Sequence, residues 1–208
     1  MPINHRVREG ETVASIAAPH GLAPETVWDD PANAQLKAQR GDPNILAPGD
    51  VVVVPDKRAK EESGATEQRH RFRTHRSTVT LRLVLHDAGN KPVANAACTL
   101  VVGERSFDLT SDGDGQIEQR VPAGEQDGKL LVGEQLLPMK IGHLDPLDVH
   151  AGQRERLNNL GYRAGQGDDP DAPAYRSAVE EFQCDYDLGV NGVCGLETQN
   201  KLKEVHGC

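Results

Sequence analysis

The sequence predicts an α+β chain of several small domains: an N-terminal βααβ module, a central antiparallel β-sandwich and a C-terminal domain of three helices. Apolar residues have helical spacing near both ends of the chain and alternate strictly in the middle. A charged stretch with few large apolar residues follows the first module. At 208 residues the chain is long enough for several such domains. We expect boundaries at residues 1–56, 57–77, 78–142 and 143–208.

The first module is expected to begin with a strand and a helix. Arg6 to Arg8 predicts a short extended stretch, and Gly10 predicts a sharp turn because glycine tolerates a positive φ. Thr12 is a suitable N-cap for a helix that ends at His20-Gly21. The spacing i, i+3, i+4 predicts one buried row on this helix, made of Val13, Ile16 and Ala17.

A second helix and a closing strand complete the module. The helix covers Ala23 to Trp28 and carries Pro24 in its first turn, where a missing N–H costs nothing. The β-branched run Val51 to Val54 ends at Pro55, which favours a strand paired with the first one. The connection Pro31 to Asp42 is long, so it either covers a groove or presents another partner.

Residues 5–17 (HRVREGETVASIA) and 44–55 (NILAPGDVVVVP) together resemble a LysM module, the small unit that binds N-acetylglucosamine in peptidoglycan and chitin. The resemblance implies a shallow glycan groove between two loops. An N-acetyl sugar offers an amide for backbone hydrogen bonds and a methyl group for an apolar wall. The alternative, that these residues only hold the fold together, is preferred for Gly10, Pro48 and Gly49 and stays open for the loops. The groove residues would be Gly10, Glu11, Thr12, Asn44, Ile45 and Leu46.

Residues 57–77 are rich in charge and predict a solvated linker. Contact of the basic second half with an acidic protein or a phosphate is the alternative. That half surrounds Phe72 and contains Arg69, His70, Arg71, Arg73, His75 and Arg76.

The central region is expected to form a small antiparallel sandwich. From Thr78 to Leu85 polar and apolar residues alternate, as in a half-buried strand that leads into a turn at Asp87–Asn90. Residues 89–93 and 110–115 weakly resemble carboxypeptidase-regulatory or transthyretin-like sandwiches, which serve as spacers and adhesion modules. Further strands are expected at Ala97–Val102, Ser106–Thr110 and Ile117–Val121.

Asp112 and Asp114 lie among glycines and could be mistaken for a calcium loop. An EF-hand would continue with further oxygen ligands and a distant glutamate, whereas here the chain runs into an apolar strand at Ile117. We therefore predict a hairpin turn and no metal site.

Three segments of the C-terminal region resemble the three-helix peptidoglycan-binding domain found beside many wall hydrolases: residues 153–162, 178–183 and 188–198. Gly161 and Gly195 would act as helix boundaries. The family commonly has an acidic-glycine, aromatic-glycine, threonine pattern before its second helix, and residues 167–175 depart from it, which leaves protein binding as an alternative to glycan binding. The expected contact rows are Leu157 with Leu160, Val179 with Phe182, and Leu196 with Leu202.

Four cysteines give a compartment clue. Two of Cys184, Cys194 and Cys208 could pair in an oxidising space, and the sequence leaves the connectivity open. Cys98 falls in an apolar strand and is expected to be a buried small hydrophobe.

The sequence predicts no enzyme, no cofactor and no metal. It contains no His-Glu-x-x-His helix, Gly-x-Ser-x-Gly elbow or phosphate loop. The segment His143 to Pro146 is the most enzyme-like fragment, with His150 as the nearby candidate base, but a packing role is favoured.

Charge and hydropathy argue against several further classes of protein. A net charge of -9 and few aromatic residues argue against nucleic-acid and anionic-membrane binding. No apolar stretch approaches the roughly 20 residues that span a bilayer. Residues 1–10 lack the features of a secretory signal, so we expect synthesis in the cytoplasm and, if the protein is exported, delivery by a secretion system.

The predicted function is non-catalytic binding of peptidoglycan glycan strands by two weak modules on one chain. The arrangement also resembles proteins that accompany type VI secretion spikes and effectors, which implies a spike or effector protein as a partner. The alternative is an assembly adaptor of a contractile injection system, in which the LysM-like and helical domains bind protein rather than glycan.

Overall fold

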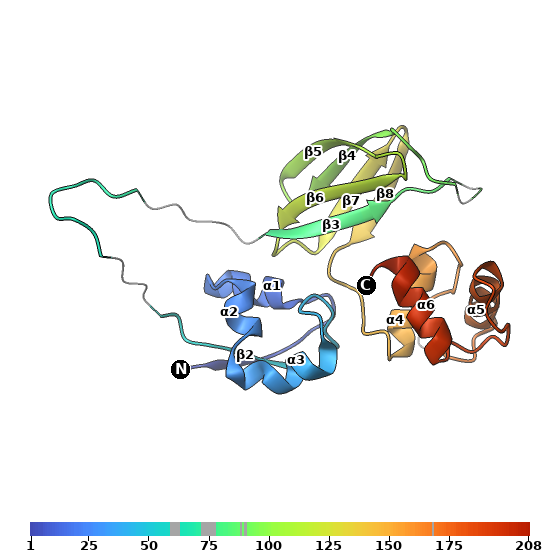
Figure 1. Ribbon diagram of the computed structural model, residues 1–208, viewed down its shortest axis with the longest axis horizontal. Coiled ribbons are helices and arrows are strands. Elements are labelled where there is room, and N and C mark those ends of the chain that lie inside the picture. Colours follow the sequence, from blue (N-terminus) through green and yellow to red (C-terminus); the bar gives the residue numbers. More distant parts are fainter. Residues whose placement is uncertain (59–62, 72–77, 88, 90, 168) are drawn as a thin grey trace. The chain divides into compact units, whose positions relative to one another are not determined.

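The computed structural model describes all residues except 59–62, 72–77, 88, 90 and 168 (Figure 1). The described chain divides into two compact units. The first contains residues 1–44 and 48–143, and the second contains residues 144–208 together with the short segment 45–47. No helix of the described part is long and apolar enough to cross a membrane.

The first unit begins with a small module of two strands and three α-helices. Strand β1 pairs antiparallel with β2, from Ile3 opposite Val54 to Arg6 opposite Val51. The strand covers Ile3–Arg6, whereas the extended stretch was predicted at Arg6 to Arg8, so the prediction was shifted toward the C-terminus. The elements are β1 (Ile3–Arg6), α1 (Val13–Ala17), η1 (Ala18–His20), α2 (Pro24–Trp28), η2 (Pro31–Asn33), α3 (Ala34–Arg40) and β2 (Val51–Val54), where η denotes a 3₁₀ helix.

The structure confirms the residues that were predicted to begin and end the first helix and to begin the second. The Thr12 hydroxyl accepts from Ser15 N, and the Ser15 hydroxyl accepts from Thr12 N, which together form a capping box. Gly21 has a φ of 61° after the 3₁₀ turn, the left-handed conformation that favours glycine. Pro24 lies in the first turn of α2, where no N–H is required. The predicted buried row of α1, Val13, Ile16 and Ala17, is 3% exposed or less.

The third helix, α3, was not predicted and fills the long connection before β2. Asn33 is buried, and its amide nitrogen donates to Val27 O and Val53 O, at 2.7 and 2.8 Å. Its amide oxygen accepts from Val53 N at 2.8 Å. At the other end, Arg40 forms two hydrogen bonds with the carboxylate of Asp50. Both ends of α3 are therefore attached to the segment that forms β2.

The rest of the first unit is an antiparallel sandwich of a two-stranded and a four-stranded sheet, as predicted. The four-stranded sheet has the order β5-β4-β7-β8, and β3 pairs with β6 in the other. The predicted alternation along β3 is confirmed, since Val79, Leu81 and Leu83 pack against the core. Strands β7 and β8 were not predicted. The strands are β3 (Thr78–Val84), β4 (Ala97–Val102), β5 (Arg105–Thr110), β6 (Gln116–Pro122), β7 (Asp127–Val132) and β8 (Gln135–Lys140).

The predicted hairpin after β5 is wrong, because β5 and β6 lie in different sheets. The turn between them carries the chain from one sheet to the other. The Asp112 carboxylate closes this turn by accepting from Asp114 N and Gln116 N, at 2.9 and 2.8 Å. In the earlier turn, Asp87 accepts from Gly89 N and Lys91 N, while Ala88 and Asn90 lie outside the described residues.

The second unit is built on three helices, α4 (His150–Asn159), α5 (Pro173–Asp185) and α6 (Leu196–His206). Gly161 follows α4 with a φ of 94°, and Gly195 is the N-cap of α6, as expected. The expected contact of Leu196 is wrong, because this side chain is 75% exposed at the first position of α6. The shared core consists of Leu157, Ala164, Tyr175, Ala178, Val179, Phe182, Cys194 and Leu202.

The predicted linker 57–77 has no helix or strand among its described residues. Described residues of its basic half, such as His70 and Arg71, are exposed. The remaining members of that cluster, Phe72, Arg73, His75 and Arg76, lie outside the described residues.

Candidate functional site

The loop between α5 and α6, residues 188–195, is organised by one buried side chain, Gln183. Its amide oxygen accepts from Asn191 N and Gly192 N, at 2.9 and 3.0 Å. Its amide nitrogen lies 3.0 Å from each of three acceptors, Asn191 Oδ1, Val193 O and Thr198 Oγ1. Gln183 is 1% exposed, so its amide cannot form hydrogen bonds with water, and these protein groups satisfy it instead.

Gly192 lets the loop close tightly over α5. Its φ is 70°, and a Cβ at this position would lie 2.7 Å from Cγ of Arg176. A larger residue would therefore be strained by the backbone and would also displace a side chain of α5. Gln183 and Gly192 together therefore fix the conformation of the loop.

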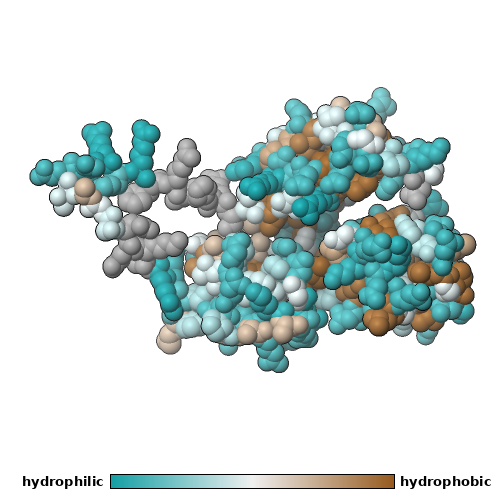
Figure 2. Space-filling view, in the orientation of Figure 1, coloured by the Kyte–Doolittle hydropathy of each residue, from teal (hydrophilic) through white to brown (hydrophobic). Residues whose placement is uncertain are grey.

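This ordered loop exposes aliphatic side chains at three positions. Val190 is 58% exposed, Val193 is 63% exposed, and Leu196, where α6 begins, is 75% exposed. Hydrophobic side chains reach the surface of the helical unit at the right of Figure 2. Exposed apolar groups beside fixed polar groups are typical of a surface that binds ligands with both kinds of groups, such as N-acetylated sugars.

A second buried polar residue, Arg156, fixes the ends of the helical domain. Its guanidinium donates to Asp145 O, Gly152 O and Cys208 O, at 2.9, 2.7 and 2.8 Å. Burial lowers the pKa of Arg156, and nearby negative charges oppose that shift. The domain is thus closed by one charged side chain that binds backbone carbonyls from three segments.

Behind the loop lies a buried polar cluster around Tyr175. The phenol donates to Gln153 Oε1 at 2.6 Å, and the ring centroid lies 3.9 Å from that of His150. Burial raises the pKa of the Tyr175 phenol, and the nearby Cys194 raises this pKa further. The Cys194 thiol is itself buried, which raises its own pKa to about 11. His150, which the sequence offered only as a candidate base, therefore packs on an aromatic ring.

All four cysteines are thiols in this structure. Cys98 is buried in β4, as predicted, and burial raises its pKa. Cys184 is exposed on α5, Cys194 is buried, and Cys208 is partly exposed near His206. A disulfide among the last three stays a prediction.

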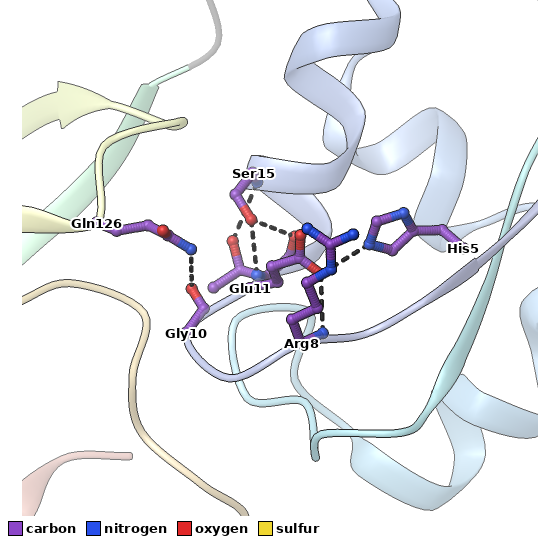
Figure 3. A network of polar contacts seen from close by, with 7 residues as sticks. His5, Arg8, Gly10, Glu11, Ser15 and Gln126 are labelled. Carbon is purple, nitrogen blue, oxygen red and sulfur yellow. Dashed lines mark hydrogen bonds and ion pairs between the residues drawn. The ribbon is translucent and has the colours of Figure 1, made fainter.

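In the N-terminal module, the predicted glycan residue Glu11 is held by its own loop. Its Oε2 lies 2.7 Å from His5 Nε2 and accepts from Arg8 N at 2.9 Å (Figure 3). Desolvation acts to raise the pKa of Glu11, but the hydrogen bonds from His5 and Arg8 outweigh it and lower the pKa from its usual 4.5. Glu11 therefore shapes the loop between β1 and α1.

The other predicted glycan residues differ in their environment. Thr12 is buried, with its hydroxyl in the capping box, and Asn44 is exposed. Within the first unit the two loops are joined by a hydrogen bond from Val13 N to Pro43 O at 2.9 Å. Ile45 is half-buried and Leu46 is 4% exposed, and both belong to the segment grouped with the second unit.

The first of these loops also contacts other parts of the first unit. The Gln126 amide donates to Gly10 O at 2.9 Å, as Figure 3 shows. The ring of His143 lies so close to Gly10 that a Cβ there would clash with it. His143 thus packs against a glycine of the loop, and this backbone carbonyl already has a donor.

Gln183, Arg156 and Asn33 were not singled out from the sequence, although each fixes a loop or a terminus. One signal was available for Gln183, because it follows Phe182 directly and lies four residues after Val179, close to the buried face of the helix. Among the described residues, no group of three or more His, Cys, Asp or Glu side chains could hold a metal ion.

Residues 148–202 match a protein-family model described as a putative peptidoglycan binding domain. No curated protein and no solved structure matches the chain. The matched residues include Gln183, Gly192 and the exposed side chains of the α5–α6 loop. The family match supports non-catalytic binding of peptidoglycan by the helical domain.

Proposed function

We propose that the chain is a non-catalytic peptidoglycan-binding protein and that residues 188–196 of its helical domain contact the wall polymer. The observation that carries the proposal is the family match at 148–202, on a domain whose only exposed large aliphatic residues within described α5, α6 and their loop are Val190, Val193 and Leu196. Peptidoglycan offers acetyl and alanine methyl groups for these side chains and amides for the loop backbone.

Cosedimentation of the full chain with purified sacculi tests this surface. The double substitution Val193→Ser and Leu196→Ser should weaken binding about 10-fold, which corresponds to a loss of about 1.4 kcal/mol when two central contact residues are truncated together. The matched control is Leu136→Ser with Leu137→Ser on β8, which removes two exposed aliphatic side chains outside the helical domain and should leave binding unchanged. Equal loss in both variants would show a nonspecific hydrophobic effect and refute the proposed surface.

The N-terminal module is proposed to add a second, weaker contact with the glycan strand. Its support is the LysM-like pattern at residues 5–17 and 44–55, together with the paired strands and helices that these residues form. Because Glu11 and Thr12 use their side chains internally, the backbone of this loop and the exposed Asn44 are the groups left to bind a sugar. Asn44→Ala should reduce sacculus binding, and no change would confine binding to the helical domain.

A second candidate is an architectural role for the N-terminal module, and one observation favours it. The carbonyl of Gly10 already accepts from Gln126, and His143 packs against the same glycine. In this alternative the loop binds its own chain and the module serves protein assembly. Gln126→Ala separates the two roles, because it should strengthen sacculus binding if Gln126 competes with sugar and leave it unchanged if the loop is architectural.

Association with a contractile injection system is a finer proposal that rests on the likeness of the whole arrangement to proteins that accompany secretion spikes and effectors. A tagged full chain should then capture a defined spike or effector protein from lysate of the native cells. Capture of sacculi alone, with no such protein, would contradict it.

A further inference from the structure

The loop between α5 and α6 contains a chemically labile dipeptide, Asn191-Gly192. An asparagine carboxamide is attacked by the backbone nitrogen of the next residue, and this intramolecular reaction is fastest before glycine, which has no side chain to block the approach. The pair Asn-Gly occurs once in the sequence. Asn191 is exposed, so water reaches its side chain. The chain therefore carries its preferred site of deamidation in this loop.

Gln183 holds both reacting groups of this dipeptide. Its amide oxygen accepts from Gly192 N at 3.0 Å, and Gly192 is buried, so a base in the solvent does not reach the N–H that must lose its proton. Its amide nitrogen donates to Asn191 Oδ1 at 3.0 Å, and Val193 N donates to the same oxygen at 2.8 Å. The attacking nitrogen and the carboxamide that it attacks are therefore both fixed while the loop is closed.

The two products of deamidation differ in how they fit this loop. An aspartate at position 191 keeps the side-chain oxygen that accepts from Gln183 and Val193. An isoaspartate instead lengthens the backbone before Gly192 by a CH₂ group. Gly192 has little room to move, because even a Cβ there would lie 2.7 Å from Cγ of Arg176. Isoaspartate therefore disrupts the loop, whereas aspartate preserves its hydrogen bonds.

We propose that Asn191 is a site of spontaneous deamidation and that Gln183 controls its rate by holding the loop closed. When the loop opens, Gly192 N attacks Cγ of Asn191 and a C–N bond forms. The bond from Cγ to Nδ2 breaks, and Nδ2 leaves as ammonia with the proton that Gly192 N gives up. Water then opens the cyclic imide at one of its two carbonyl groups, which gives aspartate or isoaspartate. The modification thus marks chains whose loop has opened.

The test follows the full chain at mildly alkaline pH by peptide mass mapping, with an isoaspartyl methyltransferase as the probe for isoaspartate. The same chain in concentrated urea gives the rate without structure. Deamidation of Asn191 should be about 10-fold slower in the folded chain, because the loop must first break the hydrogen bonds of Gln183. Equal rates in the two conditions, or faster deamidation at Asn200 than at Asn191 in urea, would overturn the proposal.

Two variants separate the bonds to the reacting groups from a general loss of packing. Gln183→Leu removes the acceptor of Gly192 N and should raise the rate without urea about 10-fold. Thr198→Val removes a different partner of Gln183 and leaves its bonds to Asn191 and Gly192 in place, so the rate should change by less than about 2-fold. Both variants are measured under conditions where hydrogen exchange shows that α4 stays protected, so unfolding of the domain does not contribute.

An unchanged rate in Gln183→Leu, or an equal increase in both variants, would also overturn the proposal. Neither measurement uses sacculi, so its failure leaves the proposed function untouched.

Discussion

Gln183 shows how one buried side chain determines an exposed surface. It satisfies backbone groups of Asn191, Gly192 and Val193 that would otherwise be poorly solvated under the loop. A buried polar group without its partner costs about 1–3 kcal/mol, so the loop loses much of its order if this residue is removed. The positions of the exposed Val190 and Val193 therefore depend on Gln183, although Gln183 itself is buried.

Gln183→Leu should therefore destabilise the helical domain by about 2–4 kcal/mol, because it removes the acceptor of the buried Gly192 N–H and the part-buried Asn191 N–H together with the other bonds of the Gln183 amide. Amide hydrogen exchange of α5 and α6 in the full chain measures this loss directly. The control is Gln166→Leu, at an exposed position, which should leave exchange unchanged. Equal protection in both variants would show that the network does not support the loop.

Glu11 gives the N-terminal module a pH-dependent contribution. Its pKa in the folded state lies below the usual 4.5, so its stabilising effect is present above that value and is lost as the pH falls through the lowered pKa. Glu11→Gln should lower the melting temperature more at pH 7 than at a pH well below 4.5, where the carboxylate becomes protonated in the folded state. Fluorescence of Trp28, the single tryptophan of the chain, reports on this module. A difference that stays constant between the two pH values would contradict the assignment.

Sequence reasoning identified the residues whose role follows from local rules and missed those whose role depends on distant partners. The Thr12 cap and the Gly21 turn depend on neighbours within a few residues, so local patterns predicted them. Arg156 and Asn33 were not singled out, because nothing near them in sequence shows which carbonyls they bind. The prediction for Leu196 was wrong because it relied on a local rule alone. An apolar residue at helical spacing is usually buried, but this side chain is exposed.

At the scale of elements, α3 is the clearest difference between expectation and structure. Its sequence, AQLKAQR, has good helix formers but one apolar anchor, Leu36, so a periodicity search gives little signal. Tertiary bonds supply the rest, through Asn33 at its start and the Arg40–Asp50 pair at its end. Helix formation here follows from attachment to β2.

Asn33→Ala tests that explanation. It removes hydrogen bonds to Val27 and Val53, and it should cost the N-terminal module about 2–4 kcal/mol, because buried groups of β2 and α2 lose their partner. Urea unfolding followed by Trp28 fluorescence measures the change. Gln39→Ala, at an exposed position of α3, is the control and should change stability by less than about 0.5 kcal/mol. Similar midpoints for both variants would contradict the role of Asn33.

The strand of the sandwich with the cleanest alternation, β3, was predicted from it. Strand β7 contains the apolar run Leu130 to Val132, and β8 contains Pro138 and the exposed Leu136, so neither alternates clearly. Strand β8 is an edge strand, where proline is tolerated. The hairpin error after β5 has a similar cause, because a tight turn does not reveal which sheet the next strand joins.

At the scale of the whole molecule, two binding modules on one chain would act by avidity. Linking weak sites raises the effective concentration of the second and can lift overall binding roughly 10²-fold to 10⁴-fold when both engage. The Asn44→Ala and Val193→Ser changes should then each reduce sacculus retention, and their combination should bring it close to background. Loss from one change alone, with no effect of the other, would indicate a single binding site.

The most direct measurement of the central claim is chemical-shift mapping of the full chain with soluble, uncrosslinked peptidoglycan fragments. The account predicts concentration-dependent shifts of backbone amides in residues 188–198, with the same fragments released unaltered. Saturable chemical-shift changes that are confined to these residues, and that disappear in the variant with Val193→Ser and Leu196→Ser, would support the loop as the wall contact. An unperturbed loop at saturating fragment, or fragments cleaved during the titration, would contradict non-catalytic binding at this site.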